Sequence, residues 1–269
     1  MPTIAVNDTA IYHERTGQGP AMLFVHGMCG DADAWADQAR RFSDRYTCVR
    51  YDRRGHTRSA RGDETISDAL HADDAAALIE ALDLAPCLLV GSSGGAAIGV
   101  DVALRYGGLL RGAVFSEPPL FSIDGDAGEA FMRELFPAVE DAIATGGSWV
   151  DAFFAQVCPG LWSMIDGTGK DRYRRNADIG FADLQSPSLD VTPADLSAAA
   201  VPTLVISGST SHASFGSVAH RLAGALPDAR YVELTGCGHV TYAEQPEAFA
   251  NAVSVFAAEL DRHPTGASN

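Results

Sequence analysis

Five residues near the middle of the chain carry the strongest chemical signal. Residues 91–95 read GSSGG and match the pattern G-x-S-x-G with Ser93 at its centre. They follow an apolar run at 87–90 and precede a helix expected over 96–106. A nucleophile on such a strand-to-helix turn needs small neighbours because the backbone passes close to itself, and the helix N-terminus offers N–H groups to an oxyanion. We therefore predict that Ser93 is a nucleophile.

A serine hydroxyl is a poor nucleophile unless a base accepts its proton. Of the eight histidines, His239 follows a strand expected at 231–234 and precedes a helix expected over 244–260. That loop lies at the same edge of a parallel sheet as Ser93. We therefore expect His239 to be the base.

A second loop at this edge begins with His26-Gly27-Met28, directly after the apolar run 21–25. We expect the Met28 N–H to pair with the Gly94 N–H as an oxyanion hole. We expect His26 to brace this loop, and we count His26 and Ser92 among the residues that contact the substrate.

Apolar runs alternate with helical periodicity along most of the chain. The expected strands are 3–6, 9–12, 21–25, 47–51, 87–90, 112–115, 203–206 and 231–234, and the expected helices between them are 31–42, 66–84, 96–106, 215–226 and 244–260. The alternation predicts an α/β fold with a mostly parallel, doubly wound sheet and helices on both faces. The core would comprise 1–117 and 197–262, and 263–269 would be a flexible tail.

Between residues 118 and 196 only helical periodicity is seen, over 130–144, 148–156 and 171–177. An all-helical insertion predicts a cap over the carboxyl edge of the sheet, where open α/β sheets bind ligands. Most of its aromatic residues fit the core of such a cap. We nevertheless expect an apolar pocket, with Trp149, Phe153 and Trp162 binding substrate and Phe121 as a further candidate.

The composition excludes some classes of function. The 269 residues contain 19 Lys and Arg against 35 Asp and Glu, a formal charge of −16. Such a chain repels nucleic-acid phosphates and anionic membranes, so we expect neither as a partner. Five cysteines without paired spacing, no leader pattern and no run of membrane-spanning length predict a cytoplasmic protein. The oligomeric state is left open.

The chain resembles the α/β-hydrolase superfamily over nearly all of its length. The matching pieces, in family order, are residues 26–28 (HGM), 51–59 (YDRRGHTRS), 91–95 (GSSGG), 202–208 (PTLVISG) and 238–239 (GH). The resemblance implies a capped serine hydrolase with Ser93 as nucleophile, His239 as base and the cap inserted after the sixth strand. Relatives that open epoxides or remove halogens carry Asp in place of this serine, so that chemistry is disfavoured.

The chain departs from the family at the acid. Most relatives carry G-x-x-D after the strand that matches 203–206, but residues 208–211 read GSTS and no Asp or Glu occurs from 208 to 227. An imidazole base still needs a carboxylate to fix its tautomer. Glu117, after the strand next to the one that bears Ser93, is the best substitute, so the acid would follow strand 6 rather than strand 7. Asp190, Asp195 or a bare Ser–His dyad are the alternatives.

These features predict a serine hydrolase that cleaves a small to medium apolar carboxylic ester, lactone or thioester through an acyl-enzyme. No metal or organic cofactor is implied, because the nucleophile belongs to the chain. The same fold also supports carbon–carbon hydrolase, lyase or perhydrolase chemistry. A non-catalytic small-molecule receptor is the third possibility.

Overall fold

A computed structural model describes residues 2–262, so the expected tail 263–269 lies outside the described residues. The strands are β1 (Thr3–Val6), β2 (Thr9–Thr16), β3 (Ala21–Val25), β4 (Thr47–Tyr51), β5 (Cys87–Ser92), β6 (Leu110–Ser116), β7 (Thr203–Gly208) and β8 (Ala229–Leu234). Apart from the helices that follow β6 directly, described below, the α-helices are α1 (Ala36–Phe42), α2 (Asp68–Ala81), α3 (Gly94–Arg105), α9 (Pro193–Ser197), α10 (Ala213–Ala225), α11 (Thr241–Glu244) and α12 (Pro246–Arg262).

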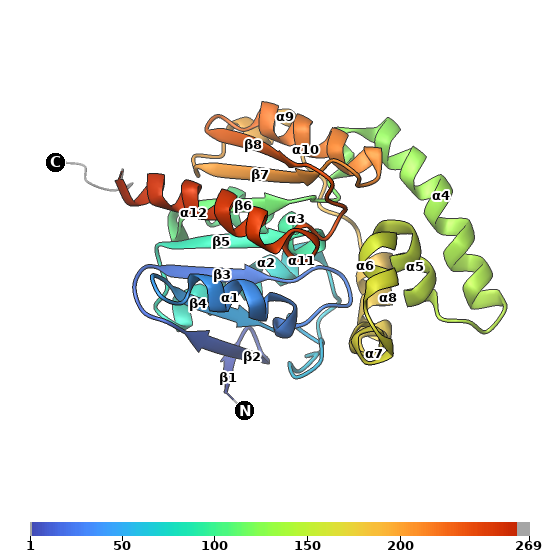
Figure 1. The fold of residues 1–269 in the computed structure, drawn as a ribbon. Coiled ribbons are helices and arrows are strands. Elements are labelled where there is room, and N and C mark those ends of the chain that lie inside the picture. The colour runs from blue at the N-terminus through green and yellow to red at the C-terminus, as the bar shows by residue number, and fades with distance from the viewer. Residues whose placement is uncertain (1, 263–269) are drawn as a thin grey trace.

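The strands form one sheet in the order β1-β2-β4-β3-β5-β6-β7-β8 (Figure 1). From β4 to β8 all pairings are parallel, and β1 and β2 add an antiparallel edge. The chain leaves β3 toward β4 on one side and returns to β5 on the other. This reversal is the switch point at which open α/β sheets bind ligands, and the sheet confirms the predicted α/β class.

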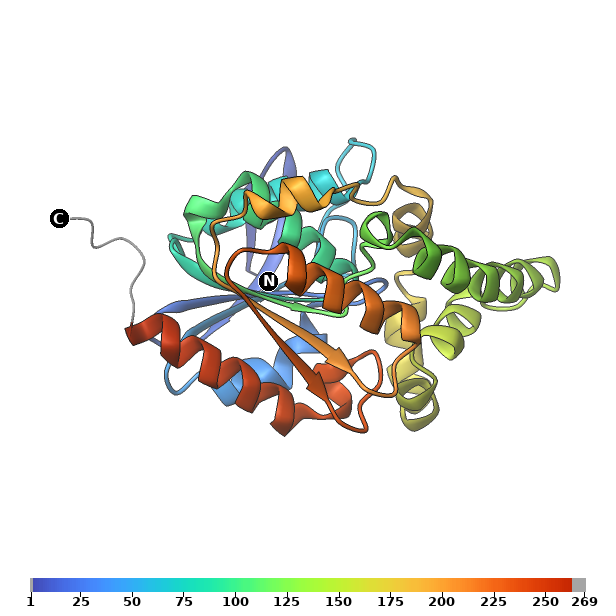
Figure 2. The same ribbon diagram turned by 90° about the horizontal axis from the view of Figure 1, so that it is seen from above.

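Helices cover both faces of the sheet (Figure 2). α1 and α12 lie together on one face, and α2, α3 and α10 lie on the other. β3 reads AMLFV and is buried along its whole length, as a strand covered on both sides must be. Its alternating side chains feed two separate apolar clusters, with Phe24 on the α12 side and Leu23 on the α2 side.

The segment after β6 forms the cap. Its helices are α4 (Gly125–Ala144), α5 (Trp149–Val157), α6 (Pro159–Met164), α7 (Gly167–Arg174) and α8 (Ala177–Gln185). They gather beyond the carboxyl ends of the parallel strands (Figure 1). α4 buries Phe131, Leu135 and Val139, which are spaced four residues apart on one face of the helix. α9 spans the expected boundary at 196 and packs against α10.

Two parts of the cap differ from expectation. α6 was not foreseen, and Pro159 takes its first position, where a missing N–H costs nothing. The single helix expected at 171–177 is replaced by α7 and α8, which are separated at Asn176. The Asn176 side chain bonds to two loops of the core, and those bonds favour a break in the helix at this point.

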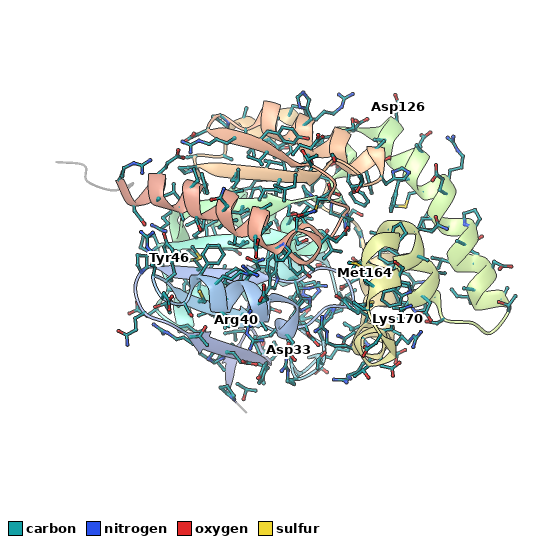
Figure 3. All side chains as sticks on the ribbon, in the orientation of Figure 1. Asp33, Arg40, Tyr46, Asp126, Met164 and Lys170 are labelled. Atoms are coloured by element: carbon teal, nitrogen blue, oxygen red, sulfur yellow. The ribbon has the colours of Figure 1, made fainter. Side chains whose placement is uncertain are left out.

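Charged side chains lie mainly on the outside, where Asp33, Arg40 and Asp126 are exposed around the ribbon (Figure 3). All five cysteines are free and buried. Among residues 2–262, no helix has the length and apolar character needed to cross a membrane.

The layered core makes one substitution informative at two positions. Val114 in β6 is fully buried, whereas Val255 on α12 is 54% exposed. We expect Val114→Ala to lower the free energy of unfolding by about 2–3 kcal/mol, from lost apolar burial plus the cavity left behind. Val255→Ala should change it by less than about 0.5 kcal/mol. Urea denaturation measures both, and equal losses would contradict the assigned burial.

Candidate active site

Ser93 stands on a strained turn between β5 and α3. Its φ is +54° and its ψ is −127°, a backbone conformation that residues other than glycine rarely adopt. A Cβ atom at Gly91 would lie 2.3 Å from the Gly95 carbonyl oxygen, and one at Gly95 would lie 2.2 Å from the Val25 carbonyl oxygen. Both positions therefore require glycine, for the reason that the sequence pattern anticipates.

Two backbone nitrogen atoms, those of Gly94 and Met28, lie near each other beside this turn. Gly94 is the first residue of α3, and Met28 follows β3, the strand adjacent to β5. The Cβ position of Gly94 lies 3.8 Å from the Met28 nitrogen. Within residues 2–262, neither N–H donates to a turn, a loop or a side chain. The pair is placed as an oxyanion hole would require.

Glu117 occupies the first position after β6. It is fully buried and has a φ of +52°, so the chain turns sharply out of the sheet here. Its Oε1 accepts the Gly208 N–H at 2.7 Å, and its Oε2 lies 2.8 Å from Nδ1 of His239. The structure thus brings Glu117 and His239 together. It leaves Asp190 and Asp195 exposed, and Asp195 instead caps the short helix α9.

A third donor to Glu117 comes from Ser211, a residue that the sequence reasoning missed. Ser211 is the last residue of the GSTS string, where most relatives carry the acid. Its hydroxyl donates to Oε2 of Glu117 at 2.5 Å. A hydroxyl therefore stands where the G-x-x-D pattern would put a carboxylate after β7, and it donates to the carboxylate at the end of β6. The departure from G-x-x-D was the available signal.

His239 lies in the loop after β8, and Glu244 holds the backbone on either side of it. The two Glu244 oxygens accept the Gly238 and Val240 N–H groups at 3.0 and 3.1 Å. Nε2 of His239 is buried and has no hydrogen-bond partner among the described residues. It shares a small cavity of about 30 Å³ with Ser93. The ring is thus anchored at Nδ1, has no partner at Nε2, and lines the same small cavity as Ser93.

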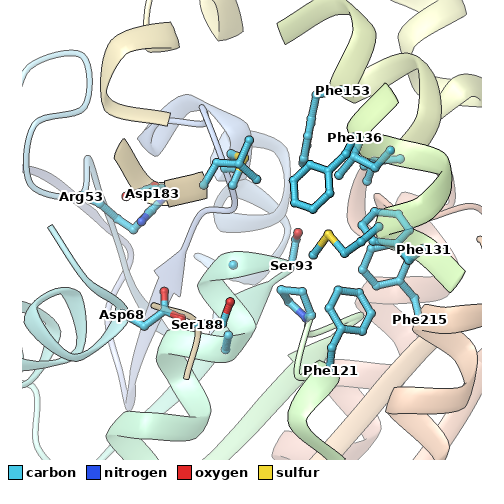
Figure 4. Close-up of a pocket in the computed structure, with 18 residues that line it drawn as sticks. Arg53, Asp68, Ser93, Phe121, Phe131, Phe136, Phe153, Asp183, Ser188 and Phe215 are labelled. Carbon is cyan, nitrogen blue, oxygen red and sulfur yellow. Dashed lines mark hydrogen bonds and ion pairs between the residues drawn. The ribbon is translucent and has the colours of Figure 1, made fainter. Parts of the chain in front are cut away.

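A larger cavity of about 120 Å³ lies between Ser93 and the cap (Figure 4). Met28, Ser93 and Gly94 line it on the core side, and Phe121, Phe131, Met132, Leu135, Phe136, Phe153, Val157, Leu184 and Phe215 form its apolar wall. Phe153 lies where the sequence reasoning placed it, and Ser92 lines the smaller cavity. The flanking cap residues Phe131 and Phe136 were not singled out in advance.

Three of the expected substrate-binding residues do not reach either of these two cavities. His26 is fully buried in the loop that also carries Met28. Its Nδ1 lies 2.8 Å from the Gly27 oxygen, and its Nε2 accepts the Arg53 backbone N–H at 3.0 Å. Trp149 and Trp162 pack within the cap against Phe181 and Phe154. For the two tryptophans, helical periodicity identifies apolar residues but does not say which neighbour a ring faces. For His26, its place after β3 does not say which way its ring points.

The cap is tied to the core by a buried polar cluster. Nη2 of Arg53 donates to Oδ2 of Asp183 on α8 at 2.8 Å, and Nε2 of His71 lies 3.0 Å from the other oxygen. Asn176 adds a second tie, because it accepts the Thr57 N–H at 2.8 Å and donates to the Gly30 oxygen. These contacts hold the cap beside the loop that follows β3 and carries Met28.

The surroundings of this cluster disfavour a positive charge on its histidines. Burial lowers the pKa of His26 and His71 and lowers that of His56 to about 3, and the positive charge of Arg53 acts in the same direction. Burial alone would raise the pKa of Asp183, but the charge of Arg53 and the hydrogen bond from His71 outweigh it and lower that pKa. The cluster therefore contains one stable ion pair among neutral rings.

Within residues 2–262, no three His, Cys, Asp or Glu side chains gather as a metal site would require. The chemistry available at this edge of the sheet is that of a hydroxyl, an imidazole and a carboxylate. Two free amides and an apolar cavity complete the arrangement.

Known proteins share this arrangement of elements. The pattern that defines the alpha/beta hydrolase family matches residues 22–252. The chain is 36% identical over 139 residues to the uncharacterized hydrolase YraK of Bacillus subtilis, in an alignment that covers 49% of this chain and about half, 51%, of YraK. It is 28% identical over 261 residues to a non-heme chloroperoxidase of Kitasatospora aureofaciens, covering 89% and 92% of the two chains.

Solved structures agree on the fold. An esterase from a Rhodococcus species superposes with a TM-score of 0.79 at 22% identity, covering 96% of this chain and 98% of the esterase. At this identity the likeness concerns the fold alone.

The neutral histidines make stability depend on pH. The unfolded chain protonates His56 near its ordinary pKa of about 6.5, whereas the folded ring stays neutral to about pH 3. The free energy of unfolding should therefore fall as the pH drops, with His56 contributing up to about 1.4 kcal/mol per pH unit. We expect His56→Gln to reduce this slope by up to about 1.4 kcal/mol per pH unit between about pH 6 and pH 4, because one proton fewer is taken up on unfolding. Urea denaturation at a series of pH values measures the slope. The exposed His220→Gln is the control, and identical slopes in all three proteins would refute the assignment.

Proposed function

The chain belongs to the alpha/beta hydrolase family, and from this premise we propose that it is a serine hydrolase acting on a carboxylic ester, lactone or thioester. The observation that carries the proposal is the 2.8 Å contact between Glu117 and Nδ1 of His239, next to a serine on a strained turn. That contact leaves Nε2 as the basic nitrogen, free to take a proton from the hydroxyl.

The proposed reaction proceeds by acyl transfer. Ser93 Oγ attacks the carbonyl carbon while Nε2 of His239 accepts its proton, and Glu117 stabilises the imidazolium that forms. The Met28 and Gly94 N–H groups stabilise the oxyanion, and His239 then protonates the leaving group. Water attacks the acyl-enzyme by the same route. Ser93 makes no hydrogen bond to His239 in the free protein, and we expect that contact to tighten when substrate binds.

The apolar wall of the larger cavity supports a small to medium substrate with an apolar portion. Phenylalanine rings from the cap and from α10 surround the space above Ser93 (Figure 4). Such surfaces bind hydrocarbon by removing it from water. We propose a small-molecule acyl substrate as the partner, and neither nucleic acid nor membrane. We propose cytoplasmic action, which is supported by five buried free thiols.

One alternative chemistry has a specific observation in its favour. The similarity to a non-heme chloroperoxidase favours hydrogen peroxide as a second acceptor. Peroxide would replace water in attacking the acyl-enzyme and release a peracid. The remaining alternatives, carbon–carbon hydrolysis, lyase chemistry and a non-catalytic receptor, are outcomes of the tests below.

Covalent labelling tests the nucleophile. A fluorophosphonate probe should label the wild-type protein at Ser93 and should not label Ser93→Ala. Ser92→Ala should keep its labelling, because its hydroxyl lies one residue off the turn and on the strand side. p-Nitrophenyl esters, a lactone and peracid formation should then show which acceptor and acyl group the enzyme uses. Failure of the folded wild-type protein to label would favour the receptor.

The acid is tested by removing its charge while keeping its shape. We expect Glu117→Gln to lower kcat about a thousandfold or more, because the amide no longer stabilises the imidazolium and favours the wrong tautomer. Asp195→Asn, an exposed residue on α9, should leave kcat unchanged within about twofold. Steady-state kinetics on one ester measure both. The reverse pattern would remove Glu117 from the site.

A further inference from the structure

The larger cavity has two chemically different ends. On one side of Ser93 lie the phenylalanine rings, and on the other lie Arg53, Asp68, Asp183 and Ser188 (Figure 4). The proposed acyl transfer uses the centre of this cavity and its apolar wall. It gives no role to the polar end, although three charged side chains there border the same space.

Arg53 offers an unused donor at this end. Its side chain is only 3% exposed. Nη2 donates to Asp183 and to the Gly27 oxygen, and Nε points to His26 at 3.5 Å. Nη1 has no hydrogen-bond partner among residues 2–262 and is not fully enclosed. Because Arg53 lines the cavity, Nη1 is the nitrogen left to donate to a ligand.

Asp68 and Ser188 offer unused acceptors. Asp68 begins α2, and its Oδ2 accepts the Leu189 N–H at 3.0 Å. Its Oδ1 has no partner in the described structure, and neither does the Ser188 hydroxyl. Asp68 is half-buried, and this burial raises its pKa because fewer waters reach the charged carboxylate. A ligand that donates a hydrogen bond would relieve that deficit.

The local charges decide what kind of group fits. Arg53 and Asp183 neutralise each other, the neighbouring histidines are neutral, and Asp68 adds one negative charge. A carboxylate ligand would meet Arg53 but also two carboxylates. An ammonium ligand would meet Asp68 but also the guanidinium, whose free N–H groups it would leave without an acceptor. A neutral group with both a donor and an acceptor satisfies both sides.

We propose that this end is a subsite for a neutral amide of the substrate, whose carbonyl accepts from Nη1 of Arg53 and whose N–H donates to Asp68. The substrate class is then an ester, lactone or thioester that carries a hydrocarbon portion on one side of the scissile carbonyl and an amide on the other. The scissile chemistry rests on the proposed function. The subsite itself is a binding property and is testable without turnover.

Four non-reactive ligands that share a phenylpropyl group test the subsite by calorimetry on the wild-type protein. They are 4-phenylbutanamide, its methyl ketone analogue 5-phenylpentan-2-one, 4-phenylbutanoate and 4-phenylbutylamine. We expect the phenyl ring to pack against the phenylalanine side chains and the varied group to face Arg53 and Asp68. We expect the amide to bind about fivefold to tenfold more tightly than each of the other three, one hydrogen bond being worth about that much.

Asp68→Asn identifies the acceptor. It should lower amide affinity about fivefold and raise carboxylate affinity by a similar factor, because a negative acceptor becomes a neutral donor. Asp190→Asn, an exposed aspartate outside the cavity lining, is the matched control and should keep the wild-type order. The proposal is overturned if the carboxylate, the amine or the ketone binds as tightly as the amide, or if Asp68→Asn leaves the order unchanged. If the wild-type protein binds the four ligands in the expected order but hydrolyses no ester, lactone or thioester, only the proposed function is overturned.

Discussion

The hydrogen bond from Nδ1 of His239 to the buried carboxylate of Glu117 is the contact on which the rest of the site depends. A buried carboxylate is costly unless its oxygens are satisfied. Here the backbone of Gly208, the hydroxyl of Ser211 and the imidazole satisfy them together. The three partners come from the ends of β7 and β8. The register of the parallel sheet therefore determines where the imidazole of His239 lies.

The position of the acid explains its residue type. In this chain the carboxylate follows β6, whereas the G-x-x-D pattern places it after β7, the strand next to β8. Adjacent strands lie about 4.8 Å apart, so a side chain from β6 has farther to reach to His239 after β8. Glutamate has one methylene more than aspartate. The positive φ of Glu117 also turns the chain out of the sheet at the point where the cap begins. Glu117 therefore both contacts His239 and begins the segment that leads to the cap, so a change in the cap's direction would move the carboxylate.

The cap does more than cover the serine. Through Asp183 it places a charge against Arg53, and through Asn176 it holds the loop that carries the Met28 amide. The same ion pair forms part of the polar end of the cavity, while the opposite end is built from rings of the cap and α10. The contact that ties the cap to the core and the polar end of the cavity thus share Arg53 and Asp183.

Local patterns in the sequence determined the α/β class, the strands at 21–25 and 47–51, and the GSSGG turn, because strand burial and tight turns are set by neighbouring residues. They also singled out His239 and Glu117, since topology brings the ends of adjacent parallel strands to one edge. The boundary at 196 stays a prediction. Only the tertiary structure decided that Ser211 supports the acid, that Asp183 meets Arg53 and that Trp149 and Trp162 face away from the cavity. Those contacts join residues up to 130 positions apart, and no short-range periodicity encodes which side chains will meet across such a separation.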